Sequence, residues 1–227
     1  MNEKYNLFRK KENTNILNVT TRIEFCGTPF RGKYTLLVNG TLDNLLTRET
    51  GKKHRGLCGM SLLPDPLNDS ENELPLYTNT VCKLVERKKA HAGVLLLTDG
   101  PFQAMVVAEM YMKAGRFKDE KSFQEWRSKL LRFIQMEDLI CVTLIKPRAV
   151  LSRIKLIFET DKDHLEEIKQ RIFIQIETYN NTARQILDQY GHELPETKLI
   201  DIPGDIFDGD IIYKANKNAV FKTLGLD

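Results

Sequence analysis

Basic residues gather in one part of the chain with no acidic residue among them: Lys146, Arg148, Arg153 and Lys155. Arg153 and Lys155 fall on alternate positions of a run whose other face is apolar, because strand side chains point to opposite faces in turn. A β element that is apolar on one side and basic on the other suits contact with a nucleic-acid groove. The alternative is an ordinary hairpin whose lysines and arginines are simply solvated.

The elements that would position these cations are two apolar-alternating runs and a long helix. Residues 139–145 and 153–159 read as the two strands of an antiparallel ribbon. The following segment carries an apolar stripe at steps of three and four, formed by Leu165, Ile168, Ile172, Ile176, Tyr179, Ala183, Ile186 and Tyr190. Such a stripe predicts one long helix, which either crosses the domain or pairs with its copy in a dimer. The fold class expected is α+β, a helical core with a small antiparallel β ribbon.

Two further basic groups lie outside this stretch. Lys52, Lys53 and Arg55 belong to a glycine-punctuated segment whose glycines at 51, 56 and 59 match neither the dinucleotide-binding pattern nor a Walker A loop. We expect this segment to be a basic loop that touches DNA backbone. Arg127 and Arg132 lie off the apolar stripe of an amphipathic helix predicted over 121–135, where a solvated outer face explains them about as well.

The remaining chain divides into a flexible basic arm (1–15), a single α+β domain for DNA binding and dimerisation (16–190) and an acidic C-terminal tail (191–227). Within the domain, Ile16–Phe25 reads as a strand, and Gly93–Thr98 reads as a short buried strand or a linker. Phe102–Met112 is apolar nearly all round, which is typical of a helix buried in a core.

Composition excludes several classes of protein. With 227 residues, 41% hydrophobic and 29% charged, the chain has the content of an ordinary globular protein, and its net charge of +3 is mild. The four cysteines form no C-x-x-C pair, so reduced thiols are expected. The N-terminus shows no signal-peptide core and no apolar run is long enough to span a bilayer, so the sequence predicts a cytoplasmic protein without membrane contact.

No catalytic constellation is apparent. The histidines lack metal-ligand spacing and there is no G-x-S-x-G turn. Glu86-Arg-Lys88, with Asp65 or Asp69 upstream, is a short set that a Mg²⁺-dependent nuclease could use, and it stays open as a minor alternative. The expectation is no enzyme, no cofactor and no metal.

One stretch resembles a known family. Arg55-Gly-Leu-Cys-Gly-Met60 followed by Asp65-Pro-Leu-Asn-Asp69 resembles a segment of proteins carried by integrative conjugative elements and conjugative plasmids, some of which are AcaB-type transcriptional activators of conjugation genes. The opening Thr20-Thr-Arg-Ile-Glu-Phe25 fits the same group. The resemblance implies sequence-specific binding to promoter DNA, a homodimer and a ribbon-helix-helix-like reading head.

The sequence thus predicts a dimeric DNA-binding regulator, an activator of conjugative transfer genes, with RNA polymerase or a co-activator as a further partner. Arg153 and Lys155 would reach base edges and Lys146 and Arg148 would hold the backbone beside the ribbon. Phosphate contacts would come from Lys52, Lys53, Arg55, Arg127 and Arg132. The second hypothesis is a protein-interaction component of a conjugation apparatus, with the long helix as its partner surface.

Overall fold

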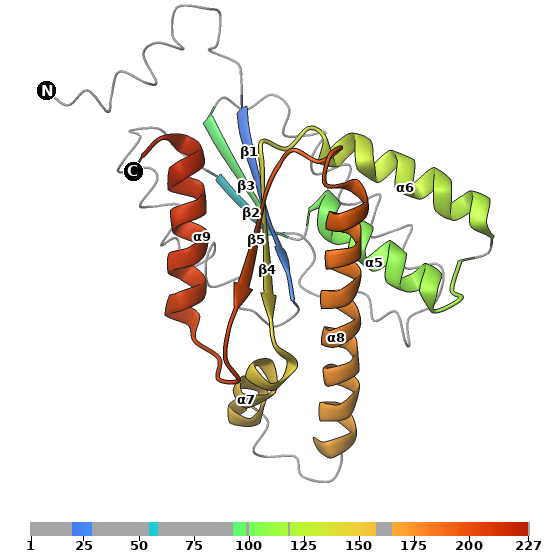
Figure 1. Cartoon of the computed structure of the whole chain (residues 1–227), viewed down its shortest axis with the longest axis vertical. Helices are drawn as coiled ribbons and strands as arrows, with labels where there is room; N and C mark the ends of the chain where they lie inside the picture. The colour runs from blue at the N-terminus through green and yellow to red at the C-terminus, as the bar shows by residue number, and fades with distance from the viewer. Residues whose placement is uncertain are drawn as a thin grey trace, which may run out of the picture.

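The computed structural model describes residues 20–28, 55–58, 93–98, 100–117, 119–157 and 165–226, and its five described strands form one sheet in the order β2-β3-β1-β4-β5. Every pairing in the sheet is parallel. The carboxyl ends of the strands therefore lie at one edge, as the arrowheads show (Figure 1). The strands are β1 (Thr20–Gly27), β2 (Arg55–Cys58), β3 (Gly93–Thr98), β4 (Leu139–Ile145) and β5 (Glu196–Ile202).

The expected α+β fold with an antiparallel ribbon is wrong, because the protein is an α/β protein with a parallel sheet. Residues 139–145 form a strand as predicted, but the second run begins inside helix α7 (Pro147–Ile157). Pro147 suits the first turn of a helix, since proline lacks an amide hydrogen and its φ is already helical. Val150, Leu151 and Ile154 then follow at helical spacing.

Helices cover both faces of the sheet. Helix α9 (Gly209–Leu224) lies on one face, and α5 (Pro101–Lys113), α6 (Glu120–Ile134) and α8 (Leu165–Tyr190) lie on the other (Figure 1). Strand β4 faces both layers: Ile140 and Val142 pack with α5 and α8, whereas Leu139 and Cys141 pack with α9. All of β4 is buried, which explains why its sequence is apolar at every position except Thr143.

The predicted core helix is confirmed. Helix α5 begins with a proline and is buried from Pro101 to Ala108. The amphipathic helix is confirmed as well: α6 begins after Asp119, whose carboxylate accepts a hydrogen bond from the amide of Ser122 at 2.7 Å. None of the described helices is long and apolar enough to cross a membrane.

Helix α8 is one long helix, and most of its apolar stripe packs within its own chain, while Ile168 near its amino end is 37% exposed. Ile172, Ile176, Tyr179, Ala183 and Ile186 are all buried within the chain. The segment after Gly191, expected as an acidic tail, contains β5, which pairs with β4, and α9, whose Val220 is fully buried against the sheet.

Candidate functional site

The carboxyl edge of the sheet is where an open parallel α/β sheet binds ligands, since the loops that leave the strands converge there. Strand β1 lies in the centre of that edge, between β3 and β4, and ends at Gly27. Its last residues are fixed by three other elements, namely α5, β4 and α8. Their side chains build the site described below.

Glu24 on β1 holds the beginning of α5. Its carboxylate, fully buried, accepts hydrogen bonds from the backbone amides of Phe102 and Gln103, each at 3.0 Å. These amides have no partner within the helix, and the positive end of the helix dipole stabilises the negative charge. The amino end of α5 is thus satisfied by the chain itself.

Gln103 connects the end of β1 to α8. Its side-chain oxygen accepts a hydrogen bond from the amide of Gly27 at 3.0 Å and another from the hydroxyl of Tyr179 at 2.5 Å. A backbone amide can only donate, so the atom that it contacts is the oxygen and the orientation of the amide is fixed. The nitrogen Nε2 of Gln103 is buried and has no hydrogen-bond partner among the residues that the structure describes. A buried donor without a partner is uncommon in folded proteins.

Thr28 follows Gly27 and is held by β4 and α8. Its amide donates to the carbonyl of Thr143 at 3.0 Å. Its hydroxyl accepts from the amide of Ile145 and donates to the side-chain oxygen of Asn180, both at 2.8 Å. The nitrogen of the Asn180 side chain donates to the carbonyl of Ile145 at 2.9 Å, so Thr28, Asn180 and Ile145 form a closed ring of hydrogen bonds. The hydroxyl of Thr28 both donates and accepts within this ring.

The segment that leaves β1 carries a phosphate-binding pattern that the sequence analysis missed. Gly27-Thr-Pro-Phe-Arg-Gly32-Lys33 has the spacing G-x-x-x-x-G-K, and we call residues 27–33 the phosphate loop. The pattern is informative only when it follows a strand, and here it starts on the last residue of β1. Gly27 has φ 133°, which favours glycine. Residues 29–33 lie outside the described part of the chain.

The signal was available in the sequence. The glycines compared with phosphate-binding patterns were those at 51, 56 and 59, whereas the matching pair is Gly27 and Gly32. The match departs from the full pattern at one position. Tyr34 follows the lysine where the pattern has serine or threonine, and Thr35 comes one residue later.

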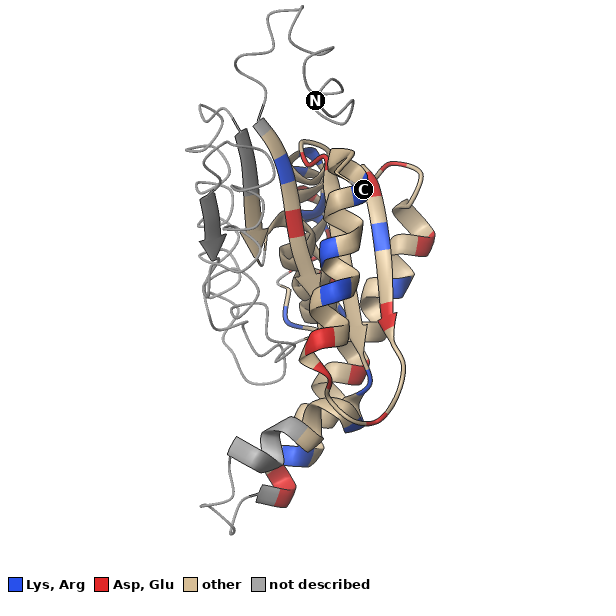
Figure 2. Cartoon of the chain, turned by 90° about the vertical axis from the view of Figure 1, so that its left-hand side faces the viewer, with Lys and Arg blue, Asp and Glu red and all other residues tan. Residues whose placement is uncertain are grey.

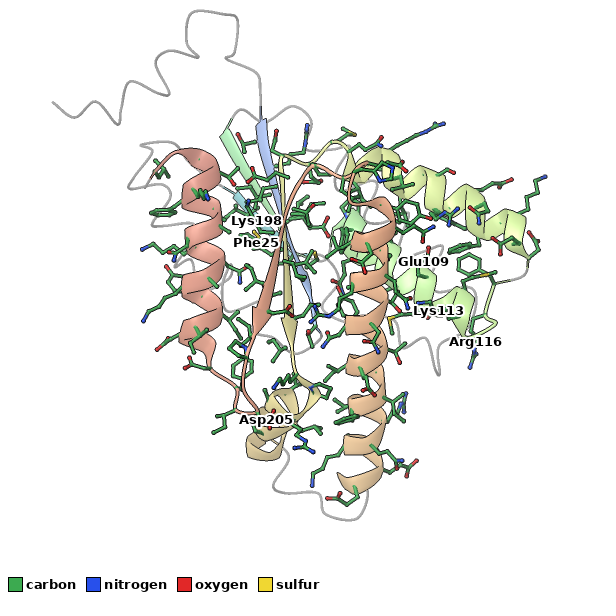
Figure 3. All side chains as sticks on the ribbon, viewed as in Figure 1. Phe25, Glu109, Lys113, Arg116, Lys198 and Asp205 are labelled. Carbon is green, nitrogen blue, oxygen red and sulfur yellow. The ribbon has the colours of Figure 1, made fainter. Side chains whose placement is uncertain are left out.

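Of the predicted DNA contacts, the structure brings two together. Lys146 and Arg148, at the start of α7, lie 3.7 Å and 3.8 Å from different carboxylate oxygens of Asp205. Asp205 lies in the loop between β5 and α9, beside α7 (Figure 3). All three side chains are largely exposed, and such pairs add little stability.

Two further predicted contacts with described side chains, Arg127 and Arg132, belong to α6. Arg127 lies over the rings of Phe123 and Tyr190, at 5.5 Å and 5.4 Å from their centres, and 4.0 Å from the carboxylate of Glu109. That arrangement joins α5, α6 and α8 and is structural. Arg132 is exposed on the last turn of α6.

Several predicted positions lie where the structure describes the backbone alone or nothing. The backbones of Arg153 and Lys155 are helical in α7, so they do not lie on a ribbon, and their side chains are outside the described part. The same holds for the side chain of Arg55 in β2. The residues outside the description altogether are Lys52, Lys53, Asp65, Asp69, Glu86 and Lys88.

Charge in the described part of the chain is mixed. Basic and acidic residues are interspersed over the strands and helices (Figure 2), with Lys198 and Asp201 on the same edge strand. Within the described ranges there is no group of three or more histidine, cysteine, aspartate or glutamate residues that could hold a metal ion.

Comparison with known proteins identifies the fold and no sequence family. No family model matches the chain, and no curated protein matches it. Among solved structures, thymidylate kinase from Candida albicans matches with a TM-score of 0.55 and 12% identity, covering 92% of this chain and 94% of that one. Deoxyadenosine kinase from M. mycoides with bound dCTP matches with a TM-score of 0.47 and 12% identity, covering 90% and 98%.

These findings contradict the family and the DNA-binding function that the sequence predicted. The chain has an α/β fold like that of the P-loop kinases, and at 12% identity the likeness to the thymidylate kinase concerns the fold alone. The expected relationship to AcaB-type activators is wrong, and so are the ribbon-helix-helix element and the DNA-binding regulator built on it, because residues 153–157 are helical and the described strands form a parallel sheet. The resemblance rested on a short stretch, 55–69, of which the structure describes only the backbone of β2.

Proposed function

We propose that the protein binds a nucleoside triphosphate through its phosphate loop and transfers the γ-phosphoryl group to a nucleoside monophosphate. The observation that carries this proposal is the position of Gly27-x-x-x-x-Gly32-Lys33 at the carboxyl end of the central parallel strand β1. In this kind of loop, backbone amides surround the phosphates and the lysine reaches the β- and γ-phosphates.

The chain offers positive charge of the kind that such a transfer needs around the triphosphate. Lys33 would balance the charge on the β- and γ-phosphates, and Lys146 and Arg148 supply further positive charge near the same edge of the sheet. The γ-phosphoryl group would pass to an oxygen of the acceptor while the nucleoside diphosphate leaves. The acceptor class is taken from the similar structure, which is a thymidylate kinase.

A second candidate is a nucleotide-binding protein that does not transfer phosphate. The residue at the metal-binding position of the pattern favours it. In P-loop proteins a serine or threonine after the lysine helps to hold Mg²⁺, which neutralises charge on the phosphates during transfer. Here that position is Tyr34. Thr35 offers a hydroxyl one residue later, and Asp99 follows β3 in the sequence. The residues present therefore match the metal-binding part of the pattern only in part.

The experiment measures binding before turnover. Isothermal titration of the purified chain with MgATP gives the affinity, and Lys33→Met serves as the variant that loses the phosphate contact. A panel of nucleosides and nucleoside monophosphates is then incubated with radiolabelled ATP, and labelled products are separated. Binding that Lys33→Met abolishes, together with a labelled acceptor, supports the kinase. Binding without any labelled acceptor supports the second candidate, and no binding by the parent overturns both.

A further inference from the structure

Two neighbouring residues of α8 hold the first two residues of the phosphate loop. Tyr179 reaches Gly27 through the side chain of Gln103, and Asn180 contacts Thr28 directly. Both contacts join segments that are far apart in the sequence. Tyr179 and Gln103 are buried and Asn180 is half-buried, so water competes weakly for these hydrogen bonds.

The hydroxyl of Thr28 decides where the chain leaves the sheet. Gly27 is the last residue of β1 in register with β4, opposite Thr143, and the amide of Thr28 makes one more ladder bond to the carbonyl of Thr143. If the ladder continued, the amide of Ile145 would donate to the backbone carbonyl of Thr28. It donates to the hydroxyl of Thr28 instead. The side chain thus ends the ladder and releases the backbone for the loop.

Asn180 fixes the orientation of that hydroxyl. The hydroxyl has one hydrogen, which it gives to the side-chain oxygen of Asn180, so its lone pairs remain available for the amide of Ile145. Asn180 in turn donates to the carbonyl of Ile145. Without the Thr28 hydroxyl the amide of Ile145 loses this acceptor, and without Asn180 the carbonyl of Ile145 loses this donor.

We propose that Asn180 and Thr28 are positioning residues for the phosphate loop, through which α8 sets the direction of the chain as it leaves β1. This inference rests on the proposed function, since the loop is assigned there to phosphate binding. It adds that the affinity for a phosphate ligand depends on a helix that lies more than a hundred residues further along the chain. Small displacements of a binding group lower affinity and turnover strongly.

The test uses a pair of variants at position 28 and a pair on α8. Thr28→Val has the same shape without the hydroxyl, whereas Thr28→Ser keeps it. Asn180→Ala removes the partner on α8, and Arg184→Ala is the matched control. Arg184 is also a polar residue of α8 bound to a strand, with its guanidinium 3.0 Å and 2.5 Å from the carboxylate oxygens of Asp201 on β5.

The first measurement needs no ligand. Amide hydrogen exchange at Thr28 and Ile145 is followed by NMR in the full chain. We expect faster exchange at Ile145 in Thr28→Val, because its acceptor is lost, and at both amides in Asn180→Ala. Thr28→Ser and Arg184→Ala should exchange like the parent.

The second measurement is the affinity for MgATP by titration calorimetry, with circular dichroism to verify the fold. Thr28→Val and Asn180→Ala should bind at least about tenfold more weakly than the parent, and Thr28→Ser and Arg184→Ala within about twofold. If Thr28→Val does not fold, Asn180→Ala against Arg184→Ala carries the comparison. Folded variants that bind MgATP like the parent overturn the positioning role.

Failure of the proposed function gives a different result. A parent chain that does not bind MgATP contradicts the nucleotide site. The exchange measurement still decides whether Thr28 and Asn180 fix the start of the loop, since exchange at Thr28 and Ile145 that is unchanged in Thr28→Val and Asn180→Ala contradicts the positioning role by itself.

Discussion

Glu24 and Gly100 lie so close that a Cβ at position 100 would stand 2.7 Å from the carboxyl carbon of Glu24. Real Cβ atoms are essentially never found so near another heavy atom. The contact exists because the carboxylate must approach the amides of Phe102 and Gln103, which lie just beyond Gly100. A side chain at position 100 would push the carboxylate of Glu24 away from these two amides.

Gly100→Ala should therefore destabilise the protein by about 1–3 kcal/mol, since the methyl group overpacks a buried site and weakens two hydrogen bonds to a charged group. Gly209→Ala is the control, because its Cβ would meet only the ring of Phe207 at 3.7 Å, an ordinary contact. Urea unfolding measures both. Equal stability of the two variants would show that Glu24 has room to move.

Gln103→Leu should cost more stability than Tyr179→Phe. The leucine removes the acceptor that the amide of Gly27 and the hydroxyl of Tyr179 share, and a buried backbone amide that loses its acceptor costs about 1–3 kcal/mol. The phenylalanine removes one donor from an oxygen that still accepts from Gly27, which costs about 0.5–1.5 kcal/mol. Denaturant titration of the two variants compares them, and a larger loss in Tyr179→Phe would contradict this hydrogen-bond pattern.

Glu137 makes stability depend on pH. Its side chain is 4% exposed, and neither carboxylate oxygen has a hydrogen-bond partner among the described residues. Burial raises the pKa of Glu137 well above 4.5, the nearby carboxylate of Glu24 raises this pKa further, and Arg22 opposes the shift. The folded state therefore keeps a proton that the unfolded state has already lost.

Because the folded state binds the extra proton, stability falls as pH rises from about 4.5 through the raised pKa of Glu137. Glu137→Gln cannot titrate, so its unfolding free energy should decrease less between pH 5 and pH 8 than that of the parent. Urea unfolding at the two pH values gives the slopes. Parallel slopes would mean that the Glu137 carboxyl is charged at both pH values in the folded protein.

Tyr34→Thr tests the departure from the phosphate-binding pattern. If the protein is a nucleotide-binding protein without transfer because the hydroxyl for Mg²⁺ is missing, the threonine should strengthen ATP binding in Mg²⁺ relative to ATP binding in EDTA. Tyr34→Phe is the control, since it keeps the ring and adds no aliphatic hydroxyl. A parent that already depends on Mg²⁺ as strongly as Tyr34→Thr would assign the metal contact to another residue.

The sequence alone determined several elements by their local pattern. Helix α5 was predictable from an apolar composition all round, α6 from its stripe and its capping Asp119, and β4 from its apolar run. In α8 the spacing of apolar residues predicted the helix. The same spacing is found at the interface between two paired helices and in a helix that packs within its own chain. Only the packing of Ile176 and Tyr179 against the other elements distinguishes the two.

Tertiary structure decided the direction of the strands and the site. Residues 153–157 alternate like a strand and also fit a helical period, and a short run cannot separate the two. Parallel pairing joins β1 to strands about seventy and a hundred and twenty residues away, and no local pattern specifies such a pairing. The spacing of Gly27, Gly32 and Lys33 was legible in the sequence, whereas Gln103, Tyr179 and Asn180 join the loop only because the fold brings three distant segments to one edge of the sheet.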